Sequence, residues 1–127
     1  MGICLDRLIP LEDTRTTPEG RWESRARFES SCEWFEGHFD EYPLVPGVAF
    51  LAILAEAVKK HGQDQNRHLW VCGFSRVRFK RLTLPGEDLQ LSIKPMPPQP
   101  EAELDFSVTC RGETVAQGLL KVRGEGY

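Results

Sequence analysis

Apolar and polar residues alternate along four segments of the chain, residues 22–29, 89–93, 104–108 and 114–122. A period of two is the pattern of a strand that buries one of its faces. Arg111-Gly112 offers a turn between the last two segments. We therefore predict strands at these positions, and the last three should form an antiparallel meander.

Residues 46–60 break this alternation. The segment reads PGVAFLAILAEAVKK, and its Ala and Leu content, its first Pro and its final lysines are typical of a helix. Between Gly47 and Val58 the only charged side chain is Glu56, so nearly the whole helix surface is apolar. Such a helix must be enclosed by other elements. The pattern indicates an α+β protein of the hotdog type, in which a curved antiparallel sheet wraps around one long apolar helix.

The length of the chain indicates one domain, and its charge argues against some classes of partner. Its 127 residues match the size of one compact domain, which we expect to span residues 1–127. A domain of this size leaves much of its surface uncovered, so association with a second copy is expected. Sixteen basic and nineteen acidic residues give a formal charge of −3, which provides no general attraction to nucleic acid or to an anionic membrane.

The sequence also predicts a location and the state of the cysteines. Pro10 and acidic residues interrupt the first segment, and no apolar run long enough to span a membrane is present, so we expect a soluble cytoplasmic protein. The cysteines lack any C-x-x-C pair, which predicts buried thiols, no disulfide and no metal site. They are Cys4, Cys32, Cys72 and Cys110.

The segment before the predicted helix carries the candidate chemistry, and it reads GHFDEYPLVPG from Gly37 to Gly47. His38 has a side chain that serves as a general base near neutral pH. Pro43 and Pro46 stiffen the link between this base and the helix. The Gly47 N–H lies at the positive end of the helix dipole, where it is a suitable donor to a carbonyl oxygen that gains negative charge. This pairing suits removal of the proton next to a thioester carbonyl, and that reaction needs no cofactor.

Residues 34–58 resemble the hotdog (3R)-hydroxyacyl-acyl carrier protein dehydratases of bacterial fatty-acid synthesis. Residues 77–89, VRFKRLTLPGEDL, are similar to the strand, Pro-Gly turn and strand that follow the central helix in that family. The short chain also resembles the dehydratase-like proteins of aryl-polyene pathways. The resemblance implies that His38 is the base, that Gly47 is the oxyanion donor, and that a 3-hydroxyacyl thioester is converted to the trans-2-enoyl product. The residues implied to contact the substrate are Phe39, Pro46, Val48 and Ala52.

The resemblance further implies partners and an assembly. The acyl group would be carried by acyl carrier protein or by coenzyme A. The protein would form a homodimer or a larger assembly of dimers, with acyl tunnels at the subunit interface.

The sequence departs from the family at the residue that supplies the acid. The family places a carboxylate on the partner's helix fourteen residues after the histidine, and here that position is Ala52. Glu56, one turn later on the helix, is an alternative acid if it is buried, and otherwise a polar residue at solvent or at the dimer seam. Asp40 and Glu41 lie close to His38 in sequence and are either participants in the site or surface carboxylates of a loop.

Basic residues gather after the helix. They form a candidate patch for an acidic carrier protein and for the phosphate of its pantetheine arm. The alternative is a solvated strand face whose apolar neighbours, Val77 and Phe79, point inward. The members of the patch are Arg76, Arg78, Lys80 and Arg81.

The other two histidines are not candidates for a metal site. His61 and His68 have no partners at metal-ligand spacing and are interpreted as structural or exposed, with His68 in a polar loop.

Besides dehydration, a hotdog protein of this kind is suited to thioester hydrolysis. A non-catalytic role as an acyl-chain or carrier-protein binding subunit is the alternative from another class, in keeping with Ala52.

Overall fold

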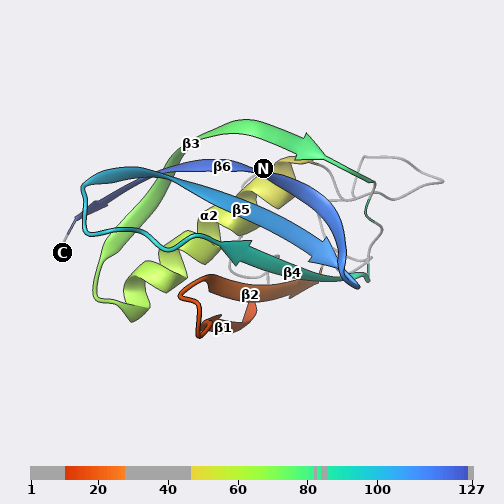
Figure 1. Ribbon diagram of the computed structural model, residues 1–127, viewed down its shortest axis with the longest axis horizontal. Coiled ribbons are helices and arrows are strands. Elements are labelled where there is room, and N and C mark those ends of the chain that lie inside the picture. The colour runs from red at the N-terminus through yellow and green to blue at the C-terminus, as the bar shows by residue number, and fades with distance from the viewer. Residues whose placement is uncertain (1–10, 28–46, 82, 84–85, 126–127) are drawn as a thin grey trace, which may run out of the picture.

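The computed structural model describes residues 11–27, 47–81, 83 and 86–125. In chain order the elements of these residues are β1 (Glu12–Thr16), β2 (Trp22–Arg27), α2 (Gly47–Asp64), β3 (His68–Phe79), β4 (Asp88–Ile93), β5 (Glu101–Cys110) and β6 (Glu113–Glu125). The strands form one antiparallel sheet in the order β1-β2-β4-β5-β6-β3 (Figure 1). Within the described residues, β1 and β3 are therefore the edge strands.

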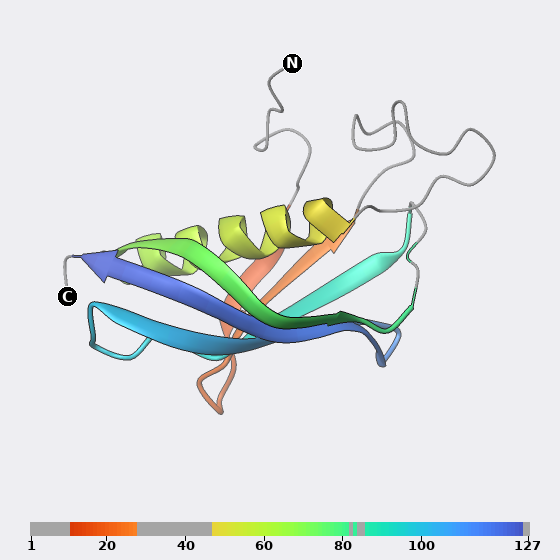
Figure 2. The ribbon, with the colours of Figure 1, turned by 90° about the horizontal axis from the view of Figure 1, so that it is seen from above.

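The helix α2 lies across one face of the curved sheet, and no other described helix or strand covers the opposite face (Figure 2). Buried side chains of the helix and the inward side chains of the strands form one hydrophobic core. Ile53, Leu54 and Val58 of the helix and Leu91 and Leu104 of the sheet are fully buried. The predicted α+β hotdog architecture is thus confirmed.

All four segments with alternating sequence are strands. β2 ends at residue 27, and residues 28–29 lie outside the described part. The order β4-β5-β6 confirms the antiparallel meander. Arg111 and Gly112 connect β5 to β6 with φ angles of 53° and 81°. Positive φ at both positions is what a tight hairpin turn requires.

Two strands, β1 and β3, have boundaries that alternation does not predict. β1 has the wholly polar sequence EDTRT and pairs with β2, where Arg15 and Glu23 form an ion pair at 3.2 Å. The expectation that His68 lies in a polar loop is wrong, because β3 begins at this residue and pairs it with Glu125 of β6. The His68 ring is exposed and lies 5.1 Å from the ring of Trp70.

The helix α2 ends at Asp64 rather than at the predicted Lys60. It continues because His61 and Gly62, just beyond the lysines, are still buried. A Cβ added to Gly62 would come within 2.8 Å of the Leu69 side chain. The last turn of the helix therefore packs against the start of β3, and the lysines do not mark its end.

The helix stops at a Schellman cap. Asn66 adopts a left-handed φ of 56°. Its N–H donates to the carbonyl oxygen of Gln63 at 3.1 Å, and the N–H of Arg67 donates to the carbonyl oxygen of Gly62 at 2.8 Å. These two bonds satisfy carbonyl groups that the helix end would otherwise leave without donors.

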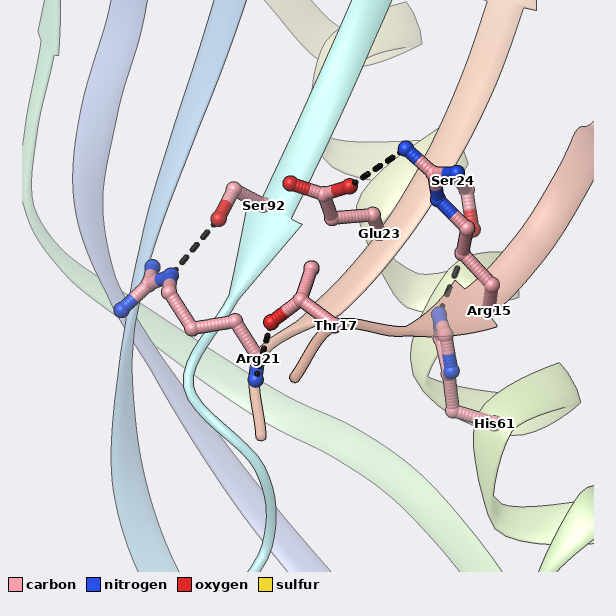
Figure 3. Close-up of polar contacts among 7 residues, drawn as sticks. All are labelled: Arg15, Thr17, Arg21, Glu23, Ser24, His61 and Ser92. Carbon is pink, nitrogen blue, oxygen red and sulfur yellow. Dashed lines mark hydrogen bonds and ion pairs between the residues drawn. The ribbon is translucent and has the colours of Figure 1, made fainter. Parts of the chain in front are cut away.

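His61 is buried between α2 and β2. Its ring stacks on the Trp22 indole, with 4.9 Å between the ring centroids and 3° between the planes. Its Nε2 lies 3.3 Å from the Ser24 hydroxyl (Figure 3). Burial lowers the pKa of His61, while the Asp64 carboxylate and a hydrogen bond with the Glu23 backbone act in the opposite direction. His61 is thus a structural residue, one of the two interpretations given by the sequence.

Two cysteines fall in the described part of the chain, and both are free thiols. Cys110 is buried as expected, whereas the expectation of burial is wrong for Cys72, which is exposed on β3. Cys4 and Cys32 lie outside the described part. Within the same ranges, no three His, Cys, Asp or Glu side chains gather as metal ligands. No helix in this part of the chain is both long and apolar enough to cross a membrane.

Candidate active site

The helix α2 begins at Gly47, the residue expected to donate to the substrate carbonyl. The first N–H groups of a helix have no acceptor within the helix, and they point toward its positive end. The role of the Gly47 N–H as oxyanion donor stays a prediction. Val48 belongs to the same first turn. The other expected site residues of this segment, His38, Phe39, Asp40, Glu41 and Pro46, lie outside the described residues and stay predictions.

The start of α2 is anchored to the end of β3. Phe50, in the first turn, is 3% exposed. Its ring meets the ring of Phe79 edge to face, with centroids 5.8 Å apart. Phe79 pairs with the buried Ala116 of β6, so it faces the helix side of the sheet, although it remains 49% exposed at the edge. The expectation that Phe79 points inward is correct in direction.

A mainly apolar groove of about 250 Å³ runs between α2 and the start of β3. Its helix wall carries residues three or four positions apart, a spacing that places them on one face of a helix. Ala52 and Glu56 both line this wall, and Glu56 is half-buried. The complete lining is Ala52, Ala55, Glu56, Lys59, His68, Leu69, Trp70 and Val71.

Glu56 therefore opens into the same groove as the position where the family has its carboxylate. The helical rise separates the two positions by about 6 Å along the axis, with Glu56 farther from Gly47. Lys59 and His68 also line the groove. Lys59 could have been predicted as a groove residue, because helical spacing places it on the same face as Ala52. His68 and Trp70 could not, because they come from another part of the chain and no local pattern brings them to the groove.

The four residues of the predicted basic patch do not share one environment. Arg76, Arg78 and Lys80 are exposed. Arg81 instead donates two hydrogen bonds to the Glu87 carboxylate, at 3.1 and 3.0 Å, and forms an ion pair with Glu113. Glu87 raises the pKa of the Arg81 guanidinium above its usual range. Arg81 therefore contacts carboxylates of this chain, unlike the exposed members of the patch.

Comparison with protein families gives one match over most of the chain. The model of the ApeI-like family, described as ApeI dehydratase, matches residues 14–119. The chain is 31% identical, over 97% of its length, to the 3-hydroxyacyl-[acyl-carrier-protein] dehydratase FabZ of Histophilus somni, of which it covers 74%. It is 38% identical, over 72% of its length, to the FabZ protein of Exiguobacterium sibiricum, of which it covers 65%.

Solved structures with the same fold include the dehydratase heterocomplex ApeI:P from Xenorhabdus doucetiae. The TM-score is 0.69 at 22% identity, and the match covers 91% of this chain and 97% of that one. A mutant of a hypothetical thioesterase protein from Streptococcus pneumoniae also has a TM-score of 0.69, at 12% identity, covering 94% of this chain and 92% of that one. At these identities the likeness establishes the fold.

Proposed function

Because the chain belongs to the ApeI-like dehydratase family, a family of hydro-lyases for acyl thioesters, we propose that it removes water from a 3-hydroxyacyl thioester to give the trans-2-enoyl thioester. The family match agrees with the resemblance of residues 34–58 to the hotdog dehydratases. The observation that carries the proposal is the start of α2 at Gly47, directly after the segment that contains His38. We further propose that residues 1–127 form a single domain.

The reaction follows from the two groups at the helix start. His38 takes the proton from the carbon next to the thioester carbonyl. The Gly47 N–H stabilises the negative charge that develops on the carbonyl oxygen. The electron pair of the broken C–H bond forms the new double bond as the C–O bond at position 3 breaks. An acid protonates the departing hydroxyl, so that it leaves as water.

Glu56 is our candidate for this acid. Its support is its place in the groove, on the same wall as Ala52 and partly shielded from solvent. A carboxyl group at this place is within the same groove as the position from which the family supplies its acid. In a dimer the acid would come from Glu56 of the partner subunit.

A homodimer would complete the groove. β3 is an edge strand of 12 residues, and within the described part no strand pairs with its outer edge. Trp70, which lines the groove next to that edge, is 36% exposed. A long open edge beside an apolar groove favours pairing with a second copy, because pairing satisfies the edge backbone groups and covers the apolar surface. Light scattering of the purified protein tests this proposal through its molar mass.

Ala52 supports a second candidate function. The position where the family has its carboxylate is occupied by alanine in this chain. The chain would then act as a subunit that binds the acyl group or its carrier, while a different subunit supplies the carboxylate. The heterocomplex named for the Xenorhabdus doucetiae protein is a precedent among proteins of this fold. The native chain alone would then show no dehydration, and Ala52→Glu would create it.

The decisive experiment compares the native protein with His38→Ala. Both are incubated with 3-hydroxyacyl thioesters of several chain lengths, on carrier protein and on coenzyme A. Enoyl product is measured for dehydration and free thiol for hydrolysis. We expect enoyl product from the native protein, with a rate about 10² to 10⁴ times higher than that of His38→Ala. Equal rates from the two proteins on every substrate would refute the enzyme proposal, and thiol release would indicate a thioesterase.

A further inference from the structure

Arg81 lies at the end of the sheet where α2 starts. At this end β2, β3 and β5 finish, and β4 and β6 begin (Figure 1 and Figure 2). Arg81 follows the last residue of β3 by two positions, and its side chain is 29% exposed. The segment with the proposed base, residues 28–46, is flanked by Arg27 and Gly47, and both of these residues lie at the same end.

The guanidinium of Arg81 closes the connection between β3 and β4. Its two terminal nitrogen atoms donate to the two carboxylate oxygens of Glu87, and this paired geometry fits a guanidinium but not an ammonium group. Its Nε contacts the carboxylate of Glu113, the first residue of β6. We call Arg81, Glu87 and Glu113 the Arg81 clasp. The clasp joins the end of β3 to the start of β4 and to the hairpin between β5 and β6.

A buried thiol holds the Glu87 carboxylate from a second side. Cys110, the last residue of β5, is 2% exposed, and its Sγ donates to Glu87 at 3.4 Å. Burial raises the pKa of this thiol, and the Glu87 carboxylate acts in the same direction, so the thiol stays a neutral donor. Glu87 therefore has a fixed place between Arg81 and the end of β5, and loss of the guanidinium would disturb more than one hydrogen bond.

On the side of β3, the clasp fixes the strand that supports the start of α2. The Lys80 N–H donates to the carbonyl oxygen of Val115 at 2.7 Å, which continues the pairing of β3 with β6 as far as the clasp. Phe79, one residue earlier, packs edge to face against Phe50 in the first turn of α2. A displacement of Arg81 would therefore loosen the contact of Phe79 with the helix start.

On the side of β4, the clasp fixes the strand that holds the end of β2. Asp88 follows Glu87 directly and is the first residue of β4. It pairs with Arg27, the last residue of β2, both in the strand register and through an ion pair at 2.6 Å. The clasp thus supports both described ends of the segment that contains His38, one through β4 and the other through β3.

We propose that Arg81 is a positioning residue for the dehydration reaction. This inference rests on the proposed function, because it takes His38 and the Gly47 N–H as the groups that must keep their relative place. The three guanidinium nitrogen atoms of Arg81 contact carboxylates of this chain, so Arg81 acts through the strands that it joins. A small displacement of the reacting groups lowers a rate strongly, even when its cause lies far from the chemistry. This role differs from the carrier-protein contact that the sequence predicts for Arg81.

The test compares the native protein with Arg81→Lys, in which lysine keeps the positive charge but loses the paired geometry. Glu113→Gln is a milder second variant that weakens only the contact with Nε. Arg123→Lys is the matched control, because Arg123 pairs with Glu101 at 3.2 Å across β5 and β6 at the other end of the sheet. One readout is amide hydrogen exchange of residues 51–54, whose N–H groups donate to the first turn of α2. The other readout is kcat and KM for dehydration.

We expect residues 51–54 to exchange about tenfold faster in Arg81→Lys than in the native protein, while residues 61–64 at the other end of the helix exchange alike. The value of kcat should fall by about 10 to 10² with KM nearly unchanged, because the substrate contacts remain and the reacting groups are misplaced. Glu113→Gln should give smaller changes in the same direction. Arg123→Lys should match the native protein in both readouts.

Unchanged exchange of residues 51–54 in Arg81→Lys and Glu113→Gln overturns the proposal, and so does an unchanged kcat in an active protein. Faster exchange along the whole helix also overturns it, because a purely structural role gives that result. A higher KM at unchanged kcat would assign Arg81 to direct contact with the substrate or its carrier instead. The exchange readout needs no turnover, so a native protein without activity would refute the proposed function alone, and exchange would still decide whether Arg81 holds the helix start.

Discussion

The two faces of α2 differ in what they contact and in what they contribute. The face toward the sheet carries fully buried side chains such as Ile53, Leu54 and Val58. The other face lines the groove beside β3 with Ala52 and Glu56. The first face stabilises the fold, whereas the second leaves space and a carboxyl group for a ligand or for a second subunit.

This difference shows why an apolar helix is an incomplete guide to function. Alanine is apolar in either setting. Ala49 and Ala57 are buried in the core, whereas Ala52 and Ala55 open into the groove. Only the position of β3 distinguishes the two sets, and this position depends on tertiary contacts.

The largest expected effect is on the groove face. Glu56→Gln should lower the dehydration rate by about 10² to 10⁴, because the amide has no proton to give to the departing hydroxyl. Thermal unfolding should be nearly unchanged, since the side chain keeps its size. Steady-state formation of enoyl product checks the rate.

Lys59→Gln is the matched control for this change, because Lys59 lines the same groove. Its rate should stay close to that of the native protein. Adding Ala52→Glu to Glu56→Gln should restore part of the lost rate by returning a carboxyl group to the family's position. A Glu56→Gln protein with full activity would remove Glu56 from the mechanism.

On the sheet face, Leu54→Ala should reduce the free energy of unfolding by about 2 to 5 kcal/mol, because it leaves a cavity in the core. Chemical denaturation followed by circular dichroism measures the loss. Lys59→Ala, on the groove face and exposed, should change it by less than about 0.5 kcal/mol. Similar losses in the two variants would contradict the division of the helix into a core face and a groove face.

A smaller effect concerns His61, on the sheet face near the end of the helix. Burial lowers its pKa below the ordinary value of 6.5. Between these two values the unfolded chain binds more protons than the folded protein, so stability is full above about pH 6.5 and falls as the pH decreases toward the folded-state pKa. Melting temperatures at pH 7.5 and pH 5 should show this fall, and His61→Phe should reduce it.

His68→Gln is the control, because His68 is exposed. It should leave the difference between the two melting temperatures unchanged. If His61→Phe melts with the same dependence on pH as the native protein, the dependence arises from other groups.

Much of the fold follows from local patterns, and the exceptions have physical reasons. Period-two segments became strands, and the apolar segment became the helix, because each pattern fits one way of burying side chains. Two bulges in β3 break its alternation. A period of two therefore does not predict this strand, or its start at His68. The stacking of His61 on Trp22 joins residues far apart in sequence, and no local pattern encodes it.

The candidate site was predictable to a different extent. Gly47 at the helix start follows from Pro46 and the apolar segment after it. The environment of the basic residues does not, because Arg81 is bound by Glu87 and Glu113 across a turn and from another strand. A charge pattern in sequence therefore does not reveal which cations are already paired.

The smallest expected effect concerns the cap where α2 turns into β3. Asn66→Ala should cost about 1 kcal/mol of stability, because a residue with a Cβ is strained at its φ of 56°. Asn66→Gly should be close to neutral, since glycine adopts this conformation without strain. Chemical denaturation of both variants measures the difference. Because the cap directs the chain into the strand wall of the groove, equal losses in the two variants would mean that the Asn66 side chain, rather than its backbone conformation, holds the helix end against β3.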